Sequence, residues 1–375
     1  MQNIAQPRDL AGKNSVCFLN YDLAYGGTEK VIVSLANHFQ SLGHQVTILT
    51  LSEANDFKDF INPNIRIVCL YVTKMKFLIP KLFSFILKNK FDNFISNVWP
   101  LTSLSFIVRI ISRDTRLIFV EHCNLTEQFQ NKSFFFKSMQ NISISIFYRF
   151  AHLIVGVSAG VKQDLINRGL SKSRIKVIYN PVISQPLKES GQINHSIQKW
   201  KASSKKKLIA VGRFKAQKNF TNLVKAIHCL KKDFNLDVSL LILGDGEEKK
   251  KIEQTIINLD LENNIFLAGW VSDPLPYYDI ADLFVLSSNY EGFGVVIVEA
   301  MSRGLNIVST DCKSGPSEIL KQGELGHLSK VDDPKSLGRS IINALANPIE
   351  KDKLVERSRD FSEIKIGKLY EEIIK

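Results

Sequence analysis

The sequence predicts an α/β protein with two Rossmann-like domains in tandem, facing a central cleft. Short apolar segments alternate with helical patterns over residues 1–180, and the alternation starts again at residue 207. This alternation is typical of a parallel sheet covered by helices on both faces. Residues 181–204 are polar, contain two prolines and lack periodicity, so they predict a linker with a short helix. A length of 375 residues suits two domains.

The first domain is expected over residues 1–180 and the second over residues 205–360. Buried parallel strands are predicted from short apolar runs that end in small or polar residues. In the first domain these runs are residues 14–20, 45–51, 65–72, 91–97, 116–122 and 152–158. In the second they are residues 207–214, 238–246, 264–271, 281–288 and 305–311. Residues 361–375 predict an amphipathic helix that packs back on the first domain.

The composition excludes several classes of protein. Hydrophobic residues make up 45% of the chain and charged residues 23%, which excludes a disordered chain or a fibre. The five cysteines lack CxxC spacing, which argues against a zinc ribbon or a disulfide framework. The polar first residues and the absence of a long apolar run predict no leader and no spanning helix. We therefore expect a cytoplasmic protein with reduced thiols.

Positive charge and phenylalanine gather in the first domain. The net charge is +12, and residues 1–180 hold 21 Lys and Arg against 11 Asp and Glu. Residues 74–150 hold 13 of the 24 phenylalanines, together with 11 basic and 4 acidic residues. Basic residues interleaved with apolar ones predict contact with an anionic membrane surface. The alternative is an aromatic core beneath a solvated basic face. No nucleic-acid-binding motif accompanies the charge, so nucleic acid is not expected as a partner.

Charged residues at predicted strand ends are the candidates for chemistry in the second domain. Glu291 lies in a turn before a helix, and Glu299 lies within that helix between apolar neighbours. A carboxylate in this position could accept hydrogen bonds from sugar hydroxyls, although a structural role is the alternative. Arg213 and Lys218 follow a predicted strand on what is expected to be an exposed loop. Two cations there can neutralise a diphosphate.

The segment 291–299, EGFGVVIVE, resembles the E-x7-E motif of the retaining glycosyltransferases of family four, which have the GT-B fold. The resemblance implies that Glu299 binds the ribose of a nucleotide-sugar donor and that Arg213 and Lys218 bind its diphosphate. Donor-binding positions are also implied around the donor sugar at Glu291, Gly292, Phe293 and Gly294, at the glycine-rich turn with Gly244, and at the base near Val271. Of these residues, Glu291, Arg213 and Lys218 are the expected catalytic ones.

Two loops of the first domain complete the predicted site. Gly26 and Gly27 precede a helix, where backbone N–H groups can approach a phosphate. Glu29 and Lys30 follow them and could be polar helix starters only. His122 ends a predicted strand; it is either structural or, as the resemblance implies, a catalytic residue beside the donor sugar. Ser158 begins a helix and is read mainly as an N-cap.

The resemblance implies a retaining hexosyltransferase that uses a nucleotide-sugar, with UDP-sugar expected, and no cofactor or metal. The acceptor is expected to be a lipid-linked glycan in bacterial capsule, lipopolysaccharide or glycan assembly. Together with the basic, Phe-rich segment, this predicts a peripheral protein on the inner face of the cytoplasmic membrane. The alternatives are a GT-B enzyme with a soluble sugar or sugar-phosphate acceptor, and a non-catalytic module that binds nucleotide-sugars. The sequence leaves the donor sugar, the acceptor, the linkage and the oligomeric state open.

Overall fold

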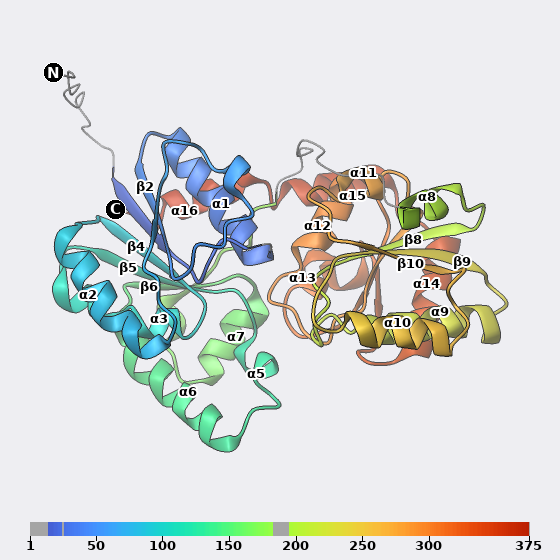
Figure 1. The fold of residues 1–375 in the computed structure, drawn as a ribbon, viewed down its shortest axis with the longest axis horizontal. Helices are drawn as coiled ribbons and strands as arrows, with labels where there is room; N and C mark the ends of the chain where they lie inside the picture. Colours follow the sequence, from blue (N-terminus) through green and yellow to red (C-terminus); the bar gives the residue numbers. More distant parts are fainter. Residues whose placement is uncertain (1–13, 25, 183–194, 375) are drawn as a thin grey trace.

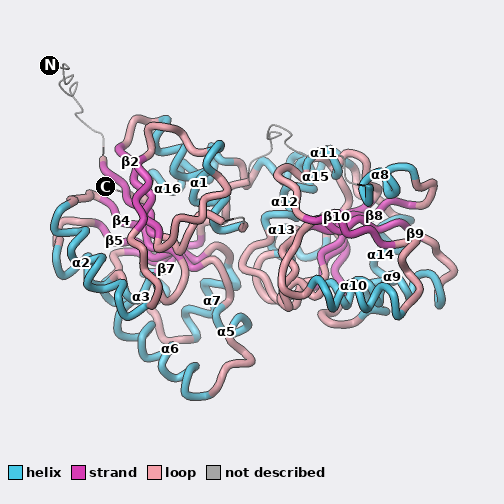
Figure 2. The backbone as a smooth tube through the Cα atoms, in the orientation of Figure 1, coloured by secondary structure: helices cyan, strands magenta, loops and turns pink. Residues whose placement is uncertain are grey.

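The computed structural model describes residues 14–24, 26–182 and 195–374 (Figure 1). Over these residues the chain forms two separate parallel sheets, one of seven strands and one of six (Figure 2). The α/β architecture with two Rossmann-like domains is therefore confirmed. The part of the predicted linker at residues 183–194 lies outside the described residues.

The first sheet has the strand order β3-β2-β1-β4-β5-β6-β7. Its strands are β1 (Ser15–Leu19), β2 (Gln45–Thr50), β3 (Arg66–Cys69), β4 (Asn93–Asn97), β5 (Arg116–Glu121), β6 (Leu153–Gly156) and β7 (Ile175–Val177). The connecting helices are α1 (Gly27–Ser41), α2 (Leu78–Lys88), α3 (Leu101–Leu104), α4 (Phe106–Ile111), α5 (Leu125–Gln128), α6 (Phe134–Phe147) and α7 (Ala159–Asn167). Six of the strands match predicted runs, whereas β7 was not predicted.

The second sheet has the order β10-β9-β8-β11-β12-β13. Its strands are β8 (Lys206–Val211), β9 (Val238–Leu243), β10 (Ile265–Gly269), β11 (Leu283–Leu286), β12 (Ile307–Thr310) and β13 (His327–Ser329). The helices are α8 (His195–Ala202), α9 (Phe220–Asp233), α10 (Lys249–Asn258), α11 (Leu275–Tyr278), α12 (Val295–Ser302), α13 (Pro316–Ile319), α14 (Pro334–Ala346) and α15 (Lys351–Arg359). The edge strand β13 was not predicted.

Two helices lie at the junctions between the domains. Helix α8 falls inside the predicted linker, but it packs on β9 and β10, and its Trp200 is fully buried and donates to the Ser239 carbonyl at 3.2 Å. Helix α16 (Glu363–Glu371) follows the second domain and lies against α1 of the first, as Figure 1 shows. Its Glu371 contacts His38 of α1 at 2.7 Å. The chain therefore passes between the domains twice.

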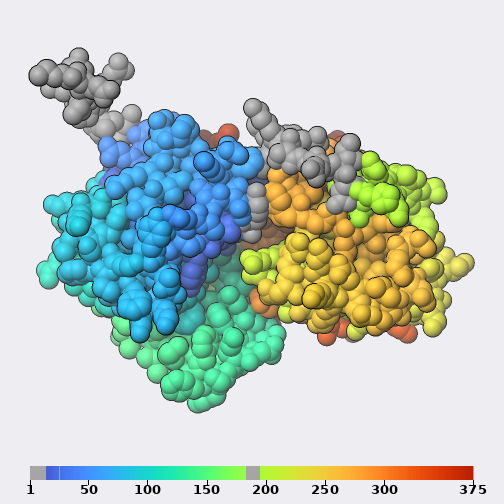
Figure 3. Space-filling model, viewed as in Figure 1, coloured from blue at the N-terminus to red at the C-terminus, as the bar shows by residue number. Residues whose placement is uncertain are grey.

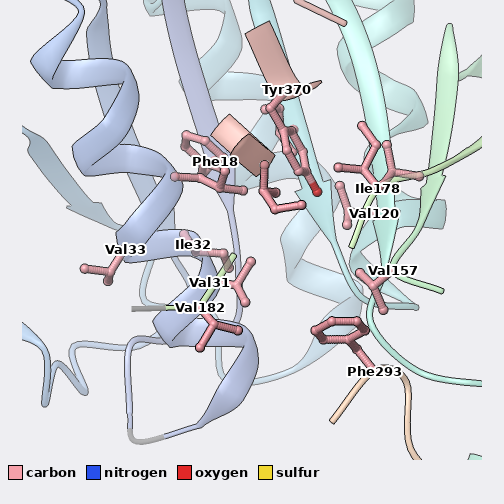
Figure 4. Packing of buried hydrophobic residues seen from close by; sticks show 14 of the residues in the cluster. Phe18, Val31, Ile32, Val33, Val120, Val157, Ile178, Val182, Phe293 and Tyr370 are labelled. Carbon is pink, nitrogen blue, oxygen red and sulfur yellow. The ribbon is translucent and has the colours of Figure 1, made fainter. Parts of the chain in front are cut away.

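The apolar core of the first domain continues into the second. Val31, Ile32 and Val33 of α1, Phe18 of β1 and Tyr370 of α16 belong to one buried cluster. Figure 4 shows the Phe293 ring of the second domain beside Val157 of the first. A separate cluster in the second domain includes Phe214, Leu223 and Ile242. The two sheets thus have their own cores, and apolar packing joins them at one edge.

The two domains touch across the carboxyl ends of their strands. Asn124 Nδ2 donates to Ser314 Oγ at 3.2 Å, and the backbone N–H groups of Ala159 and Gly160 donate to the Glu318 carboxylate at 2.7 and 3.0 Å. In Figure 3 the blue-green first domain and the yellow-orange second domain are in contact. Since ligands of open α/β sheets bind beyond the carboxyl ends of the strands, this boundary is where the site is expected.

In the part of the chain that the structure describes, no helix has both the length and the apolar character needed to cross a membrane.

Candidate active site

Glu291 is held in a fixed position by hydrogen-bond donors, of which Lys218 and Ser288 are the nearest. It lies between β11 and α12, with the residue 5% exposed. Lys218 Nζ contacts its Oε1 at 2.5 Å, and Ser288 Oγ donates to the same oxygen at 2.6 Å. The side chain of Lys218 is 16% exposed. The expectation of an exposed loop is therefore wrong for Lys218. Its side chain is largely buried because its ammonium group neutralises the charge of the buried Glu291 carboxylate.

Arg213 fits the exposed-loop expectation. It follows β8, its side chain is exposed, and within residues 14–24, 26–182 and 195–374 it has no ion-pair partner. The loop after β9 lies directly beside it, because Gly244 has φ 144° and a Cβ there would be 2.0 Å from the Gly212 carbonyl oxygen. Gly244 therefore lets the loops after β8 and β9 pack closely, and the Arg213 side chain follows directly after that contact in the chain.

Glu299 is the second buried carboxylate of the site. It lies in α12 and its side chain is 4% exposed. The Lys30 ammonium, from α1 of the other domain, contacts its Oε1. The hydroxyl of Tyr278 lies 3.5 Å from its Oε2. A cation of the first domain thus reaches across to the carboxylate that the resemblance assigns to the ribose.

The loop between Glu291 and α12 lies against the first domain. A Cβ on Gly292 would be 1.8 Å from the His122 carbonyl oxygen, so only glycine permits this approach. Gly294 has φ 101°, which lets the chain turn into α12. Phe293 was expected to face the donor sugar. This must be corrected for its side chain, because the ring is buried against Tyr179 and Phe361 with centroids 5.4 and 5.2 Å away.

His122 has a defined tautomer. Its Nε2 lies 3.0 Å from Asn97 Oδ1, and the amide of Asn97 is oriented because its Nδ2 donates to the Leu19 carbonyl at 3.0 Å. Nε2 therefore carries the proton, and Nδ1 is a hydrogen-bond acceptor. Nδ1 is buried without a partner among the described residues. Burial lowers the pKa of His122 to about 3, so the ring is neutral, and its Nδ1 can accept a hydrogen bond from a ligand hydroxyl.

Glu121 lies beneath His122 in a closed network. Thr102 Oγ1 donates to its carboxylate at 2.9 Å, the Tyr148 hydroxyl donates to it as well, and the Trp99 N–H lies at 3.3 Å. Burial raises the pKa of Glu121 to about 7, although these hydrogen bonds oppose the rise. The network fixes the end of β5, and His122 follows that end directly.

The remaining predicted positions differ in what surrounds them. Gly26 is the N-cap of α1, and a Cβ at the neighbouring Gly27 would meet nothing within 4 Å, so space remains open beside that helix. Val271 lies just beyond β10 and is half-buried. Ser158 Oγ accepts from the Val161 N–H at 3.1 Å, which confirms its N-cap role. The described residues contain no group of three or more His, Cys, Asp or Glu side chains arranged to hold a metal ion.

The structure therefore brings several of the predicted residues together at the domain boundary, whereas Gly244 packs within the second domain. Lys218 and Glu291 form a pair, Gly292 abuts His122, and Glu299 faces α1. Sequence reasoning missed Asn97 and Ser288, which orient His122 and Glu291. Both are polar residues at the ends of predicted strands, and this position is the only feature of the sequence that could have indicated a role in the site.

Two family models match the chain, one in each half. Residues 25–185 match the model described as Glycosyltransferase Family 4. Residues 192–361 match the model described as Glycosyl transferases group 1. The boundary between the two matches coincides with the predicted linker.

The curated relatives that match the chain are named as glycosyltransferases. A Campylobacter jejuni protein named N-acetylgalactosamine-N,N'-diacetylbacillosaminyl-diphospho-undecaprenol 4-alpha-N-acetylgalactosaminyltransferase is 28% identical, over 93% of this chain and 96% of that protein. The lipopolysaccharide 1,6-galactosyltransferase of Escherichia coli is 33% identical, over 48% of each chain.

Solved structures share the fold over nearly the whole chain. The Anabaena protein HepE in complex with UDP-glucose has a TM-score of 0.78 at 20% identity, covering 96% of this chain and 98% of that one. The apo form of the lipopolysaccharide outer core galactosyltransferase WaaB has a TM-score of 0.70 at 19% identity, with the same coverage. These similarities show a common two-domain fold.

Proposed function

Because the chain belongs to the GT-B glycosyltransferases, we propose that it transfers a hexosyl or N-acetylhexosaminyl unit from a UDP-sugar to a lipid-linked glycan, with retention at the anomeric carbon. The setting is bacterial polysaccharide or glycan biosynthesis, such as lipopolysaccharide or capsule assembly. One observation carries the proposal. Two buried carboxylates, Glu291 and Glu299, are each contacted by a lysine. Among the described residues, Arg213 has no ion-pair partner and His122 Nδ1 is an acceptor without a donor.

The donor roles follow from the chemistry of these groups. Glu299 accepts hydrogen bonds from the ribose, while Arg213 and Lys218 bind the diphosphate. The donor sugar lies along residues 291–294, with backbone groups in place of the buried Phe293 ring. His122 Nδ1 accepts a hydrogen bond from a hydroxyl of that sugar. The open space beside Gly27 leaves room for the phosphates at the start of α1, where Gly26 is the N-cap. Gly244 lets the loop after β9 pack beside the Arg213 loop, and the backbone near Val271 holds the base.

In this proposal the protein stabilises the leaving diphosphate without a metal. The acceptor hydroxyl oxygen bonds to the anomeric carbon on the face from which the diphosphate departs, and the bond from that carbon to the diphosphate oxygen breaks. The hydroxyl proton passes to a diphosphate oxygen. Arg213 and Lys218 stabilise the negative charge that develops there. Glu291 is held by Lys218 and Ser288, so it positions the site and is not needed as a nucleophile.

A donor and acceptor screen tests this function. UDP- and GDP-sugars are tested for thermal stabilisation of the protein, and then for transfer to an undecaprenyl-diphosphate-linked oligosaccharide or to the free oligosaccharide. We expect a UDP-sugar to stabilise the protein and only the lipid-linked acceptor to be extended. Extension of the free oligosaccharide alone would favour a soluble acceptor. Stabilisation without transfer to any acceptor would favour a non-catalytic binding module.

Two basic residues at opposite ends of β8 provide a test variant and a matched control variant for this screen. Arg213 follows the carboxyl end of the strand, at the site, whereas Lys206 begins the strand and pairs with Asp282 on the surface at 3.1 Å. Arg213→Ala should lower transfer roughly 100-fold, as loss of one electrostatic stabiliser does. Lys206→Ala should leave it unchanged. Equal effects of the two changes would refute the diphosphate role.

The acceptor proposal includes contact with an anionic membrane through α6. Phe135, Met139, Ile142 and Ile146 of this helix are all exposed, and their spacing places them on one helical face. Phe134 and Phe135 are 87% and 80% exposed, and α6 contains no acidic residue. An apolar stripe on the outer face of a helix is the reverse of ordinary amphipathic packing and fits insertion among lipid headgroups.

Neighbouring helices extend this apolar surface. Phe106 of α4 stacks on Phe147 of α6 with centroids 4.5 Å apart, and α2 packs on α4. Exposed side chains on α2, on α4 and just before α2 belong to the same helical layer; they are Phe77, Phe83, Leu87 and Ile110. Lys74, Lys76, Lys81 and Lys88 are all exposed, and Lys81 also donates to the Leu70 carbonyl at 2.8 Å. We infer that this surface rests on the inner face of the cytoplasmic membrane.

Matched apolar substitutions test the membrane contact. Phe135→Ser with Ile142→Ser removes about 2 kcal/mol of apolar burial, which should weaken binding to anionic liposomes roughly 30-fold. Transfer to the lipid-linked acceptor should fall more than hydrolysis of the donor. Ile257→Ser is the control, because Ile257 is 53% exposed on α10 of the other domain. Unchanged liposome binding in the double variant would contradict the membrane contact and would show that α6 is an ordinary solvated helix.

A further inference from the structure

Lys30 makes a contact with the opposite domain that a residue serving only to begin a helix would not need. It lies in the first turn of α1, and its ammonium contacts the Glu299 carboxylate of the opposite domain. The Lys30 side chain is only 19% exposed and that of Glu299 is 4% exposed. Holding a long side chain in a buried contact costs conformational entropy, so a polar helix start alone gives no reason for this arrangement.

The surroundings of Lys30 belong to the donor site. An ammonium group has three N–H donors, and the contact with Glu299 uses one direction. The preceding residue, Glu29, is close enough to the loop of the second domain for Lys215 to lower its pKa, against the rise that burial causes. Lys215 lies between Arg213 and Lys218. The first turn of α1 therefore faces both the proposed ribose carboxylate and the proposed diphosphate loop.

Without Lys30, the charged side chains assigned to the donor site have no net positive charge. Arg213 and Lys218 carry two positive charges, and Glu291 and Glu299 carry two negative charges, so these four groups sum to zero. A nucleotide-sugar brings a diphosphate with two negative charges, and its departure adds a third. Lys30 gives the site a net positive charge. An excess of positive charge is what stabilises a leaving diphosphate in a partly buried site.

We propose that Lys30 is a third cation of the donor site, supplied by the first domain, and that it contacts the diphosphate of the bound nucleotide-sugar. Without donor, the ammonium neutralises Glu299. When the ribose hydroxyls donate to Glu299, Lys30 turns toward the phosphates while the ion pair loosens. Catalytic charge stabilisation then depends on the approach of both domains. This assignment rests on the proposed function.

The test compares two lysines that both pair with a glutamate across the domain boundary. Lys30→Gln and Lys30→Arg are made in the full chain. Lys313→Gln is the control, because Lys313 contacts Glu127 at 2.7 Å with its own side chain 74% exposed, at the periphery. Binding of uridine, UMP and UDP is measured by calorimetry, and turnover is measured with the UDP-sugar; the guanine series is used if GDP is the nucleotide that stabilises the wild type. Circular dichroism checks that each variant is folded.

We expect Lys30→Gln to weaken UDP binding at least 10-fold, to weaken UMP binding less, and to leave uridine binding unchanged. Turnover should fall at least 10-fold, with partial recovery in Lys30→Arg and no change in Lys313→Gln. Tighter nucleotide binding in Lys30→Gln would overturn the assignment, because Lys30 would then only compete for Glu299. Equal affinities in all variants would overturn it too. If the wild type binds neither nucleotide series, the proposed function fails first, which separates the two outcomes.

Discussion

Replacing Lys218 by alanine should damage both catalysis and folding, and the two effects can be separated. Lys218 Nζ contacts Glu291 Oε1 at 2.5 Å, and both side chains are largely buried, at 16% and 7% exposure. The change removes a cation from the diphosphate and also leaves a buried carboxylate without its countercharge. Arg213, the other proposed diphosphate ligand, is exposed and has no such partner among the described residues.

The magnitudes follow from these contacts. Removing one member of a buried ion pair costs about 3 kcal/mol. For a domain of this size that corresponds to a melting temperature lower by roughly 6–12 °C. Loss of one electrostatic stabiliser should lower turnover roughly 100-fold. Arg213→Ala should show the same loss of turnover, with a change in unfolding free energy within about 0.5 kcal/mol.

Calorimetry and a transfer assay on four proteins separate the two roles. These are the wild type, Lys218→Ala, Arg213→Ala and Lys218→Ala combined with Glu291→Gln. The combined variant should recover most of the lost stability, because the uncompensated carboxylate is gone, while its turnover stays low. A Lys218→Ala protein that is as stable as the wild type would refute the ion-pair reasoning. Wild-type turnover in that variant would refute the diphosphate role.

Three further outcomes are expected. Gly292→Ala should lower turnover at least 10-fold, because its Cβ would lie 1.8 Å from the His122 carbonyl oxygen; Gly338→Ala, whose Cβ meets nothing closer than 3.6 Å, should not. Glu121 has a folded pKa of about 7, above its ordinary value, so its stabilisation is complete at acidic pH and lost as the pH rises through 7. The wild-type unfolding free energy should therefore fall by up to about 3 kcal/mol between pH 4.5 and 7, and Glu121→Gln should flatten that slope in denaturant titrations. Finally, excess EDTA should leave transfer intact; loss of activity that Mg²⁺ restores would contradict the cationic diphosphate site.

Much of the fold could be predicted because each central strand is a run of buried apolar residues. Parallel strands covered on both faces give such runs, and all strands except β7 and β13 followed them. Those two are edge strands of three residues each, too short for periodicity to distinguish them from loops. Helix α8 was assigned to the linker because its sequence is polar, whereas the packing of one residue, Trp200, attaches it to the second sheet.

The candidate site could be predicted in part, because Arg213, Lys218 and Glu291 lie in loops that follow predicted strands. What local sequence could not show is which long-range partner each side chain has. Lys30 and Glu299 are separated by 269 positions, so nothing near Lys30 in the sequence indicates its contact. The same holds for Phe293, whose glycine neighbours suggest an open donor loop while its ring packs against Tyr179 and Phe361.

The stereochemistry of the product tests the central claim most directly. An α-linked UDP-sugar is incubated with the protein and an undecaprenyl-diphosphate-linked oligosaccharide, and the new anomeric centre is assigned by nuclear magnetic resonance. The account predicts a product extended by one sugar in α linkage, at a rate that Arg213→Ala lowers roughly 100-fold. A β-linked product, or extension that does not depend on Arg213, would contradict it.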